Sequence, residues 1–360
     1  MRHLSVPKSI TEVWLSSLRS HGWLVDGAGI TAEGEMRLLP LTESAPPEGD
    51  DVWQGHAVLE REALTRGPSH WAERLPSDVP ADLMDALPSS YEIMGDVLLV
   101  KLETPLKSVA VDIATAMLAH LPNVRVVCED HGVHGTFRVR HLEVLAGRDG
   151  ATSTQTSVRE FGLTYRVDPA KVYYSARLGN ERRRSAAVLA EHASALGRPL
   201  VVFDPYAGVG PNLGLPVTEG HAAWVVAGDL NPDAMPLLQQ NLEHLVDRAR
   251  SSVEVTLHGG DGRAWREHAP FLGAADAVFV NLPHDAASHL ADLVPLLADD
   301  AVMLGWSIAD RDTEADLNAQ VRDVLEVAGR RVVSLHVEAV KGYSTTLVMH
   351  RLVVRSTTGS

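Results

Sequence analysis

Carboxylate and amide side chains close four successive apolar runs in the last part of the chain. They are Asp204, Asp229, Asp261 and Asn281. An apolar run that ends on a polar side chain is typical of a buried parallel strand. Because ligands bind at the carboxyl ends of strands in open α/β sheets, the four positions predict one ligand-binding edge.

A glycine-rich turn follows the first of these acids. Gly208 and Gly210 let the backbone approach a ligand closely, and Asp229 stands where an acid pairs with ribose hydroxyls. A nicotinamide dehydrogenase has its first glycine directly after the strand, whereas here Asp204 and three further residues intervene. The order of acid, glycine turn and two further acids favours S-adenosylmethionine as the cofactor. A nicotinamide oxidoreductase is the alternative.

Arginine is concentrated just before this region, at the start of a helix predicted within 171–198. Arg177, Arg182, Arg183 and Arg184 lie there, together with Glu181. The planar guanidinium binds phosphate groups and guanine edges in a bidentate manner. The net charge of −15 argues against a long basic surface but permits a local one. A solvated helix face is the alternative.

The pattern of predicted elements indicates an α/β protein with several domains. Residues 199–355 alternate strands with helices and end in two strands joined by a short turn, which predicts a Rossmann-like, doubly wound seven-stranded sheet with an antiparallel edge strand. Upstream we expect a small module over 1–42, a linker over 43–65 that is rich in Pro, Gly and acids, and an α/β middle domain over 66–168. The C-terminal domain then covers 169–360.

Within the middle domain, residues 135–147 read as a strand. Arg138, Arg140 and Glu143 are regularly spaced along it, which fits one face of a half-exposed strand. His131 and His134 offer only two possible metal ligands in a glycine-containing turn, so we predict a surface turn and no metal site.

Composition limits the compartment. The only cysteine, Cys128, excludes a disulfide framework and reads as a buried strand residue, which favours a reducing, cytoplasmic compartment. No apolar run is long enough to cross a membrane, so we expect no membrane partner.

The segments in their order resemble the tRNA (guanine-37-N1)-methyltransferases of the archaeal and eukaryotic type, a family of class I methyltransferases. The resemblance extends over most of the chain. The front segments, which resemble that family's N-terminal tRNA-recognition domain, are VPKSITEVWLSSLRSHGWL and EGEMRLLPL. The segments LPSSYEIMGDVLLVKL, GTFRVRHLEVLAG, VDPAKVYYSARLGNERRR, DPYAGVGP, DLNP, NLP and KGYS resemble the blocks that follow.

That family transfers the methyl group of S-adenosylmethionine to N1 of the guanosine that follows the anticodon. The resemblance implies that Glu181 is the general base, that Arg140 holds the guanine carbonyl oxygen, and that Asn281 and Pro283 place the base. Implied cofactor contacts are Asp204, Tyr206, Ala207, Gly208, Gly210, Asp229, Leu230, Asp261, Gly262 and Asn281. Implied RNA contacts are Arg138, Arg140, Arg177 and Arg182, and a flipped base needs stacking partners, for which Tyr173 and Tyr174 are candidates.

Several alternatives remain open at this point. A related enzyme of wybutosine synthesis transfers the aminocarboxypropyl group of the same cofactor, and another also methylates the wyosine base. A non-catalytic RNA-binding protein with a methyltransferase fold is the alternative of another class. We expect a monomer that acts on tRNA with guanosine at position 37, and the need for Mg is open. Asn212 stands where the family commonly has an aromatic residue.

Overall fold

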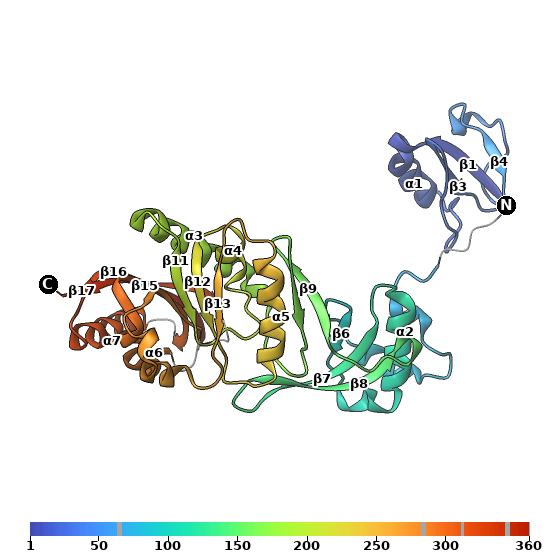
Figure 1. Ribbon diagram of the computed structural model, residues 1–360. Coiled ribbons are helices and arrows are strands. Elements are labelled where there is room, and N and C mark those ends of the chain that lie inside the picture. The colour runs from blue at the N-terminus through green and yellow to red at the C-terminus, as the bar shows by residue number, and fades with distance from the viewer. Residues whose placement is uncertain (63–66, 282–285, 311–312, 343–345, 360) are drawn as a thin grey trace. The chain divides into compact units, whose positions relative to one another are not determined.

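The computed structural model divides the chain into two compact units, each of which has its own core (Figure 1). The first unit comprises Met1–Ala81 and Thr115–Pro122, and the second comprises Asp82–Ala114 and Asn123–Ser360. The residues that the structure describes are 1–62, 67–281, 286–310, 313–342 and 346–359.

The first unit is built on a four-stranded sheet in the order β2-β3-β1-β4. Its elements are β1 (Arg2–Pro7), α1 (Thr11–Ser20), β2 (Thr31–Glu33), β3 (Met36–Pro40) and β4 (Val58–Glu60). The linker predicted over 43–65 is therefore wrong for its described part. Val58 pairs with Leu4 of β1, and Trp53 is buried in the same core as Trp14 and Leu18, because burying this apolar surface stabilises so small a module.

The middle sheet belongs to the second unit and has the order β5-β6-β7-β8. Its strands are β5 (Tyr91–Met94), β6 (Val97–Val100), β7 (Val126–His134) and β8 (Val139–Gly147). The helix α2 (Ala110–His120) connects β6 to β7, which are parallel. Cys128 is buried on β7, as predicted.

The strand predicted around Arg138 begins later than expected. Residues 135–138 form a turn, and Arg138 has a φ of 52° in the left-handed region. Arg138 and Arg140 therefore do not share one strand face, because β8 begins only at Val139.

The largest sheet has seven strands in the order β13-β12-β11-β14-β15-β17-β16, which confirms the Rossmann-like prediction. The strands are β11 (Leu200–Asp204), β12 (Ala222–Ala227), β13 (Glu254–Leu257), β14 (Ala275–Val280), β15 (Leu297–Asp310), β16 (Arg330–Gly342) and β17 (Leu347–Thr358). As predicted, β17 is antiparallel to its neighbours, but it is not the edge strand. It lies inside β16 because its side chains are mostly buried, whereas β16 exposes Val333 to solvent.

Helices cover both faces of this sheet (Figure 1). One core contains residues of α3 (Gly179–Leu196), α4 (Gly214–Thr218) and α5 (Ala234–Val246). The other contains residues of α6 (Ala286–Leu293) and α7 (Glu314–Val327). Short 3₁₀ segments, Gly262–Glu267 and Ala269–Phe271, replace a helix between β13 and β14.

A hairpin of β9 (Thr156–Glu160) and β10 (Leu163–Val167) packs against this domain. Tyr165 lies in the core that α5 helps to form, and the Asn241 side chain of α5 bonds to the backbone N–H and C=O of Arg166. The boundary predicted at 168 is therefore wrong, because the hairpin joins the C-terminal core before that point.

Arg125 ties the middle sheet to this hairpin. Its Nε donates to Asp96 Oδ2 at 2.8 Å, and its other nitrogens donate to the carbonyls of Ser153 and Gln155. Asp96 in turn accepts from the hydroxyl of Thr156 on β9. Charge-assisted hydrogen bonds of this kind fix geometry as well as adding stability.

Candidate active site

The glycine turn after β11 is held by the acid that ends the next strand. Asp229 accepts from the N–H of Gly208 at 2.7 Å and from the N–H of Asn231 at 2.8 Å. Gly208 and Gly210 have φ values of 56° and 82°, which side chains rarely adopt. A Cβ at Gly210 would lie 2.9 Å from Leu238 Cδ1. The turn therefore requires glycine, as the sequence predicted.

Buried polar atoms without a partner lie beside this turn. Asp204 is fully buried; one of its oxygens accepts from the Tyr206 N–H at 3.2 Å, and burial raises the pKa of its carboxyl to about 7. The other oxygen has no hydrogen bond of good geometry to a described residue, nor has either amide atom of buried Asn212, although the Asn212 side chain lies close enough to this carboxyl to favour its charged form. Since such atoms are rare without a ligand, the donor and acceptor set fits a polar cofactor at the turn.

The third strand end lies against the first. A Cβ on Gly262 would meet Pro205 at 2.7 Å and Tyr206 at 3.2 Å. Asp261 accepts from the backbone and side chain of Arg263, and these hydrogen bonds lower the pKa of its carboxyl. Asp204, Asp229 and Asp261 therefore lie at the same edge of the seven-stranded sheet, as predicted from the strand ends.

Apolar surface completes this region. Leu230, directly after the second acid, is 48% exposed although it is a large apolar residue. Ala207 is buried and its N–H bonds to the Gly228 carbonyl at 2.8 Å. The Tyr206 hydroxyl lies 2.7 Å from His289 Nδ1, a contact that sequence reasoning did not anticipate.

Glu181 lies in the first turn of α3 and is buried. Its carboxylate lies 3.4 Å from Arg184 Nη1 and 3.7 Å from Arg351 Nε. Nothing in the sequence indicated Arg351, because Glu181 and Arg351 are far apart in the chain and are brought together only by tertiary packing.

Asn281 directly follows β14 and is half-buried, whereas Pro283 lies outside the described residues.

Two residues predicted to meet RNA or a base are instead used inside the protein. Arg182 is buried; it donates to Glu160 at 2.5 Å and to the Ser175 carbonyl at 2.8 Å. Its guanidinium also lies over the ring of Tyr174, which is itself buried and bonded to Glu160. The predicted roles of Arg182 in RNA contact and of Tyr174 in base stacking are therefore wrong. Tyr173 is 55% exposed, so its stacking role stays a prediction.

Arg140 is already paired within the middle sheet. It donates to Asp130 at 2.5 Å and to Glu92 at 2.8 Å. These acids hold its guanidinium in place, and its predicted contact with guanine stays a prediction. Arg138 and Arg177 are exposed, as an RNA contact requires.

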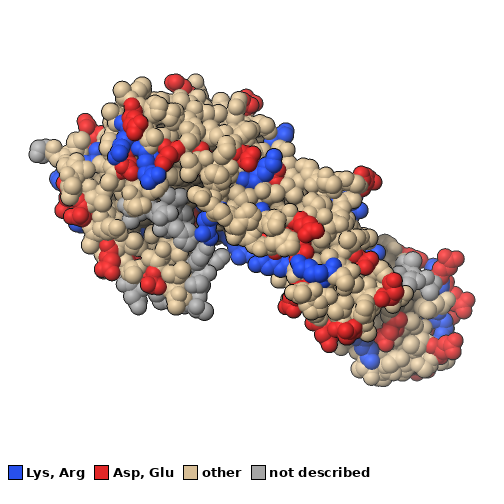
Figure 2. Space-filling view, turned by 90° about the horizontal axis from the view of Figure 1, so that it is seen from below, with Lys and Arg blue, Asp and Glu red and all other residues tan. Residues whose placement is uncertain are grey.

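A basic hollow of about 800 Å³ lies where the middle sheet meets the β9–β10 hairpin. Arg125, Arg159 and Arg166 line it, and Asp96 is the acid among its lining residues. Figure 2 shows basic side chains gathered in a band on one face of the molecule. Sequence reasoning missed this hollow; the outward positions of Arg159 and Arg166 on the two strands of the hairpin were the available signal.

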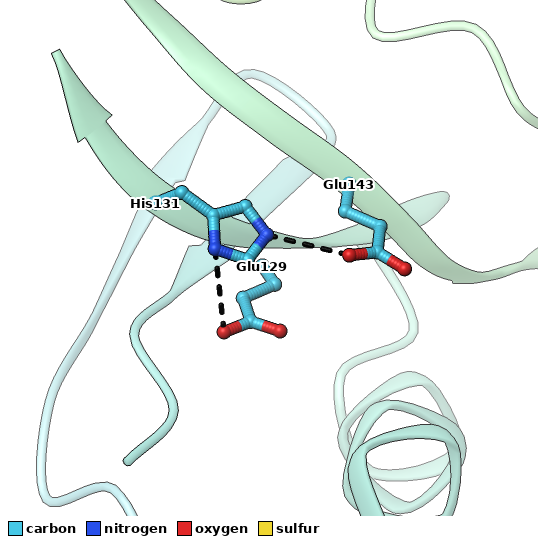
Figure 3. A group of neighbouring side chains, drawn as sticks. All are labelled: Glu129, His131 and Glu143. Carbon is cyan, nitrogen blue, oxygen red and sulfur yellow. Dashed lines mark hydrogen bonds and ion pairs between the residues drawn. The ribbon is translucent and has the colours of Figure 1, made fainter. Parts of the chain in front are cut away.

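His131 lies between two carboxylates (Figure 3). Its Nε2 is 3.3 Å from Glu143 and its Nδ1 is 3.8 Å from Glu129. Two possible metal ligands that the sequence did not indicate, Glu129 and Glu143, thus lie beside His131. The ligand atoms of Glu129, His131 and Glu143 are close enough together to share an ion. The carboxylates, however, approach different ring nitrogens, and Lys107 already pairs with Glu129. The arrangement is accounted for by these contacts between neighbouring polar side chains.

The sheet order, the glycine turn and the acids at the strand ends together define a Rossmann-like methyltransferase.

No helix in the described part of the chain is long and apolar enough to span a bilayer.

The family model of the TRM5/TYW2 methyltransferase domain matches residues 156–336, about half of the chain. The chain therefore belongs to the TRM5/TYW2 methyltransferase family, which confirms the resemblance seen in its motifs. A model of the TYW2 N-terminal domain matches residues 71–150. The two matches meet close to the start of the β9–β10 hairpin.

Individual relatives are similar along nearly the whole chain. The tRNA (guanine(37)-N(1))-methyltransferase Trm5b of Pyrococcus abyssi is 29% identical over 92% of this chain and 93% of its own. The crystal structure of wild-type Trm5b from Pyrococcus abyssi matches with a TM-score of 0.65 and 25% identity, over 99% of both chains. A structure of aTrm5 in complex with tRNALeu shares the fold with a TM-score of 0.68, at 23% identity and over 99% of both chains.

Proposed function

We propose that this chain is a tRNA (guanine-37-N1)-methyltransferase that uses S-adenosylmethionine. The observation that carries the proposal is the similarity to Trm5b of Pyrococcus abyssi, which extends over 93% of that relative and is not limited to the shared catalytic domain. The buried carboxylate of Glu181 at the start of α3 supports it, because the reaction needs a base.

The cofactor is held at the glycine turn. Gly208 and Gly210 admit it closely, Asp229 and Asp261 bind its ribose and adenine, and Leu230 offers an apolar surface to the adenine ring. Asp204, Tyr206, Ala207, Gly262 and Asn281 complete the set. S-adenosylmethionine supplies a methyl group on a positively charged sulfur.

The residues of the chain then make the guanine N1 a nucleophile. N1 carries a proton at neutral pH, and the Glu181 carboxylate would accept it as the bond from N1 to the methyl carbon forms and the carbon–sulfur bond breaks, leaving a neutral thioether. Arg140 stabilises the negative charge that develops on the guanine carbonyl oxygen, and Asn281 and Pro283 hold the base in line. Proton transfer and charge stabilisation each contribute about 2–4 kcal/mol.

The tRNA is bound through local arginines on an otherwise acidic protein. Arg138 and Arg177 are exposed, and the basic hollow adds the exposed Arg159 and Arg166. These guanidinium groups suit phosphate contacts that position the RNA. We further propose that the protein is a cytoplasmic monomer.

Aminocarboxypropyl transfer is the second candidate, because the segment 71–150 matches the TYW2 N-terminal domain. Two forms of S-adenosylmethionine distinguish the candidates, one labelled in the methyl group and one in the carboxypropyl chain. Incubation with unmodified tRNA transcript and recovery of the RNA should give methyl label only. Carboxypropyl label in the RNA would assign the protein to the second reaction.

A further inference from the structure

Arg351 is a mostly buried arginine at the ligand edge of the seven-stranded sheet. Val280 of β14 pairs with Gly305 of β15, and the next residue of β15, Trp306, pairs with Arg351 of β17. Asn281 follows Val280 directly. Asn281, Trp306 and Arg351 therefore lie at one level across three neighbouring strands, where the acceptor base is expected.

Arg351 projects toward α3. Alternate residues of a strand share a face, and Val353 of β17 packs in the same core as Leu189 of α3. Arg351 is two residues from Val353 and so faces the same side. Its Nε accordingly lies 3.7 Å from Oε2 of Glu181.

Four charged side chains meet at this point. Arg184 lies 3.4 Å from Glu181 and 2.5 Å from Glu338, and Glu338 of β16 is the backbone register partner of Arg351 on β17. The side chain of Arg184 is 42% exposed, whereas that of Arg351 is 11% exposed. Of the two cations beside Glu181, Arg351 is thus the more buried, and its charge is the less screened by solvent.

The guanidinium of Arg351 is incompletely bonded. Its Nε and Nη2 have no hydrogen-bond acceptor among the described residues, and the same holds for the indole N–H of Trp306. Burial and the charge of Arg184 lower the pKa of Arg351, while Glu181 and Glu338 act in the opposite direction. A mostly buried charge whose donors find no acceptor in the described part of the chain is unfavourable for folding alone, which points to a role in function.

We propose that Arg351 is a positioning residue for methyl transfer, which holds the carboxylate of Glu181 in the direction of the acceptor base. This inference rests on the proposed function, in which Glu181 removes the proton from guanine N1. Arg351 acts through Glu181, whose Oε2 lies 3.7 Å from Arg351 Nε.

The test is single-turnover methyl transfer to tRNA transcript by the full chain. Arg351→Gln should slow the step roughly 10- to 100-fold, part of the effect of a general base, while affinities for S-adenosylmethionine and tRNA stay within about twofold. The matched control is Arg355→Gln, on the same strand and face but opposite Val302, away from the ligand edge. It should leave the rate unchanged.

A double-mutant cycle separates positioning from a general structural effect. In a Glu181→Gln background, Arg351→Gln should have almost no further effect on the rate. Arg351→Lys, which keeps the charge, should recover part of the rate and also serves if Arg351→Gln does not fold.

Two results would overturn the inference. One is an unchanged rate in Arg351→Gln; the other is a loss of equal size with and without Glu181. Failure of the proposed function is recognised separately, because the wild-type protein would then not methylate guanosine 37 at all.

Discussion

At the residue scale, the protonation of Asp204 at the ligand edge makes the free energy of unfolding depend on pH. Burial raises the pKa of its carboxyl from 3.8 to about 7. The unfolded chain loses this proton near pH 4 and the folded chain only near pH 7, so the wild-type protein loses stability as pH rises across this window.

Asp204→Asn removes this titration. Between pH 5 and pH 8 the free energy of unfolding of the variant, relative to wild type, should rise by about 3 kcal/mol. Denaturant unfolding at both pH values measures it, and titrations common to both proteins cancel. A constant difference across pH would mean that Asp204 is already ionised in the folded protein at pH 5.

Glu181→Gln keeps the shape of the side chain and removes the base. Single-turnover methyl transfer should fall by about 10²- to 10⁴-fold, because guanine N1 then keeps its proton. Calorimetric titration with S-adenosylmethionine should give an unchanged affinity. A loss of cofactor affinity would place Glu181 in the cofactor site and contradict its assignment as base.

The positions of the acids at the strand ends were predicted well from the sequence, because the carboxyl ends of parallel strands lie at one edge of the sheet. It misassigned Arg182 and Tyr174, since spacing on a helix or turn does not reveal which face is buried against Glu160. Arg351 was missed because strand register, which brings it beside Glu181, is set by tertiary pairing.

The glycine turn is the element on which cofactor binding depends. Gly210→Ala introduces a side chain at a φ of 82° and places Cβ 2.9 Å from Leu238 Cδ1. The affinity for S-adenosylmethionine should fall by roughly tenfold or more, because left-handed backbone costs about 1–2 kcal/mol with a side chain. Calorimetric titration measures it.

Gly273→Ala is the control for this effect. Its φ is 65°, but no atom lies within 4 Å of the added Cβ, and it is outside the ligand edge. It should destabilise the protein slightly and leave cofactor affinity unchanged. Equal losses of affinity in both variants would show that the effect is general instability.

The junction between the middle sheet and the β9–β10 hairpin depends on Arg125. Arg125→Gln should lower the free energy of unfolding by about 1–3 kcal/mol, because it removes the charged bonds to Asp96 and those to two carbonyls. Arg159→Gln, which lines the same hollow but has an exposed side chain, should change stability little. Equal stability of both variants would contradict this role.

At the element scale, alternation predicted nearly all strands and helices of the C-terminal domain. The predicted domain boundaries were wrong where the composition of a segment suggested a linker. Residues 43–62 are rich in Pro and Gly yet contribute Trp53 and β4 to a core. The position of β17 inside β16 also could not be read from sequence, because local alternation does not specify strand order.

The whole molecule is acidic but acts on a polyanion in the proposed function. Its net charge of −15 repels tRNA at long range, so affinity has to come from local arginines. The basic hollow and the band in Figure 2 supply such a surface. The family could be identified from the sequence because its motifs occur in order over most of the chain.

The most direct test of the account is methylation of tRNA transcripts that differ only at position 37. The full chain, S-adenosylmethionine and a transcript with guanosine 37 should yield 1-methylguanosine at that position, identified by mass spectrometry of nuclease fragments. A transcript with adenosine 37 should yield no methylated nucleoside. Methylation of both transcripts, or of guanosine at another position or atom, would contradict the account.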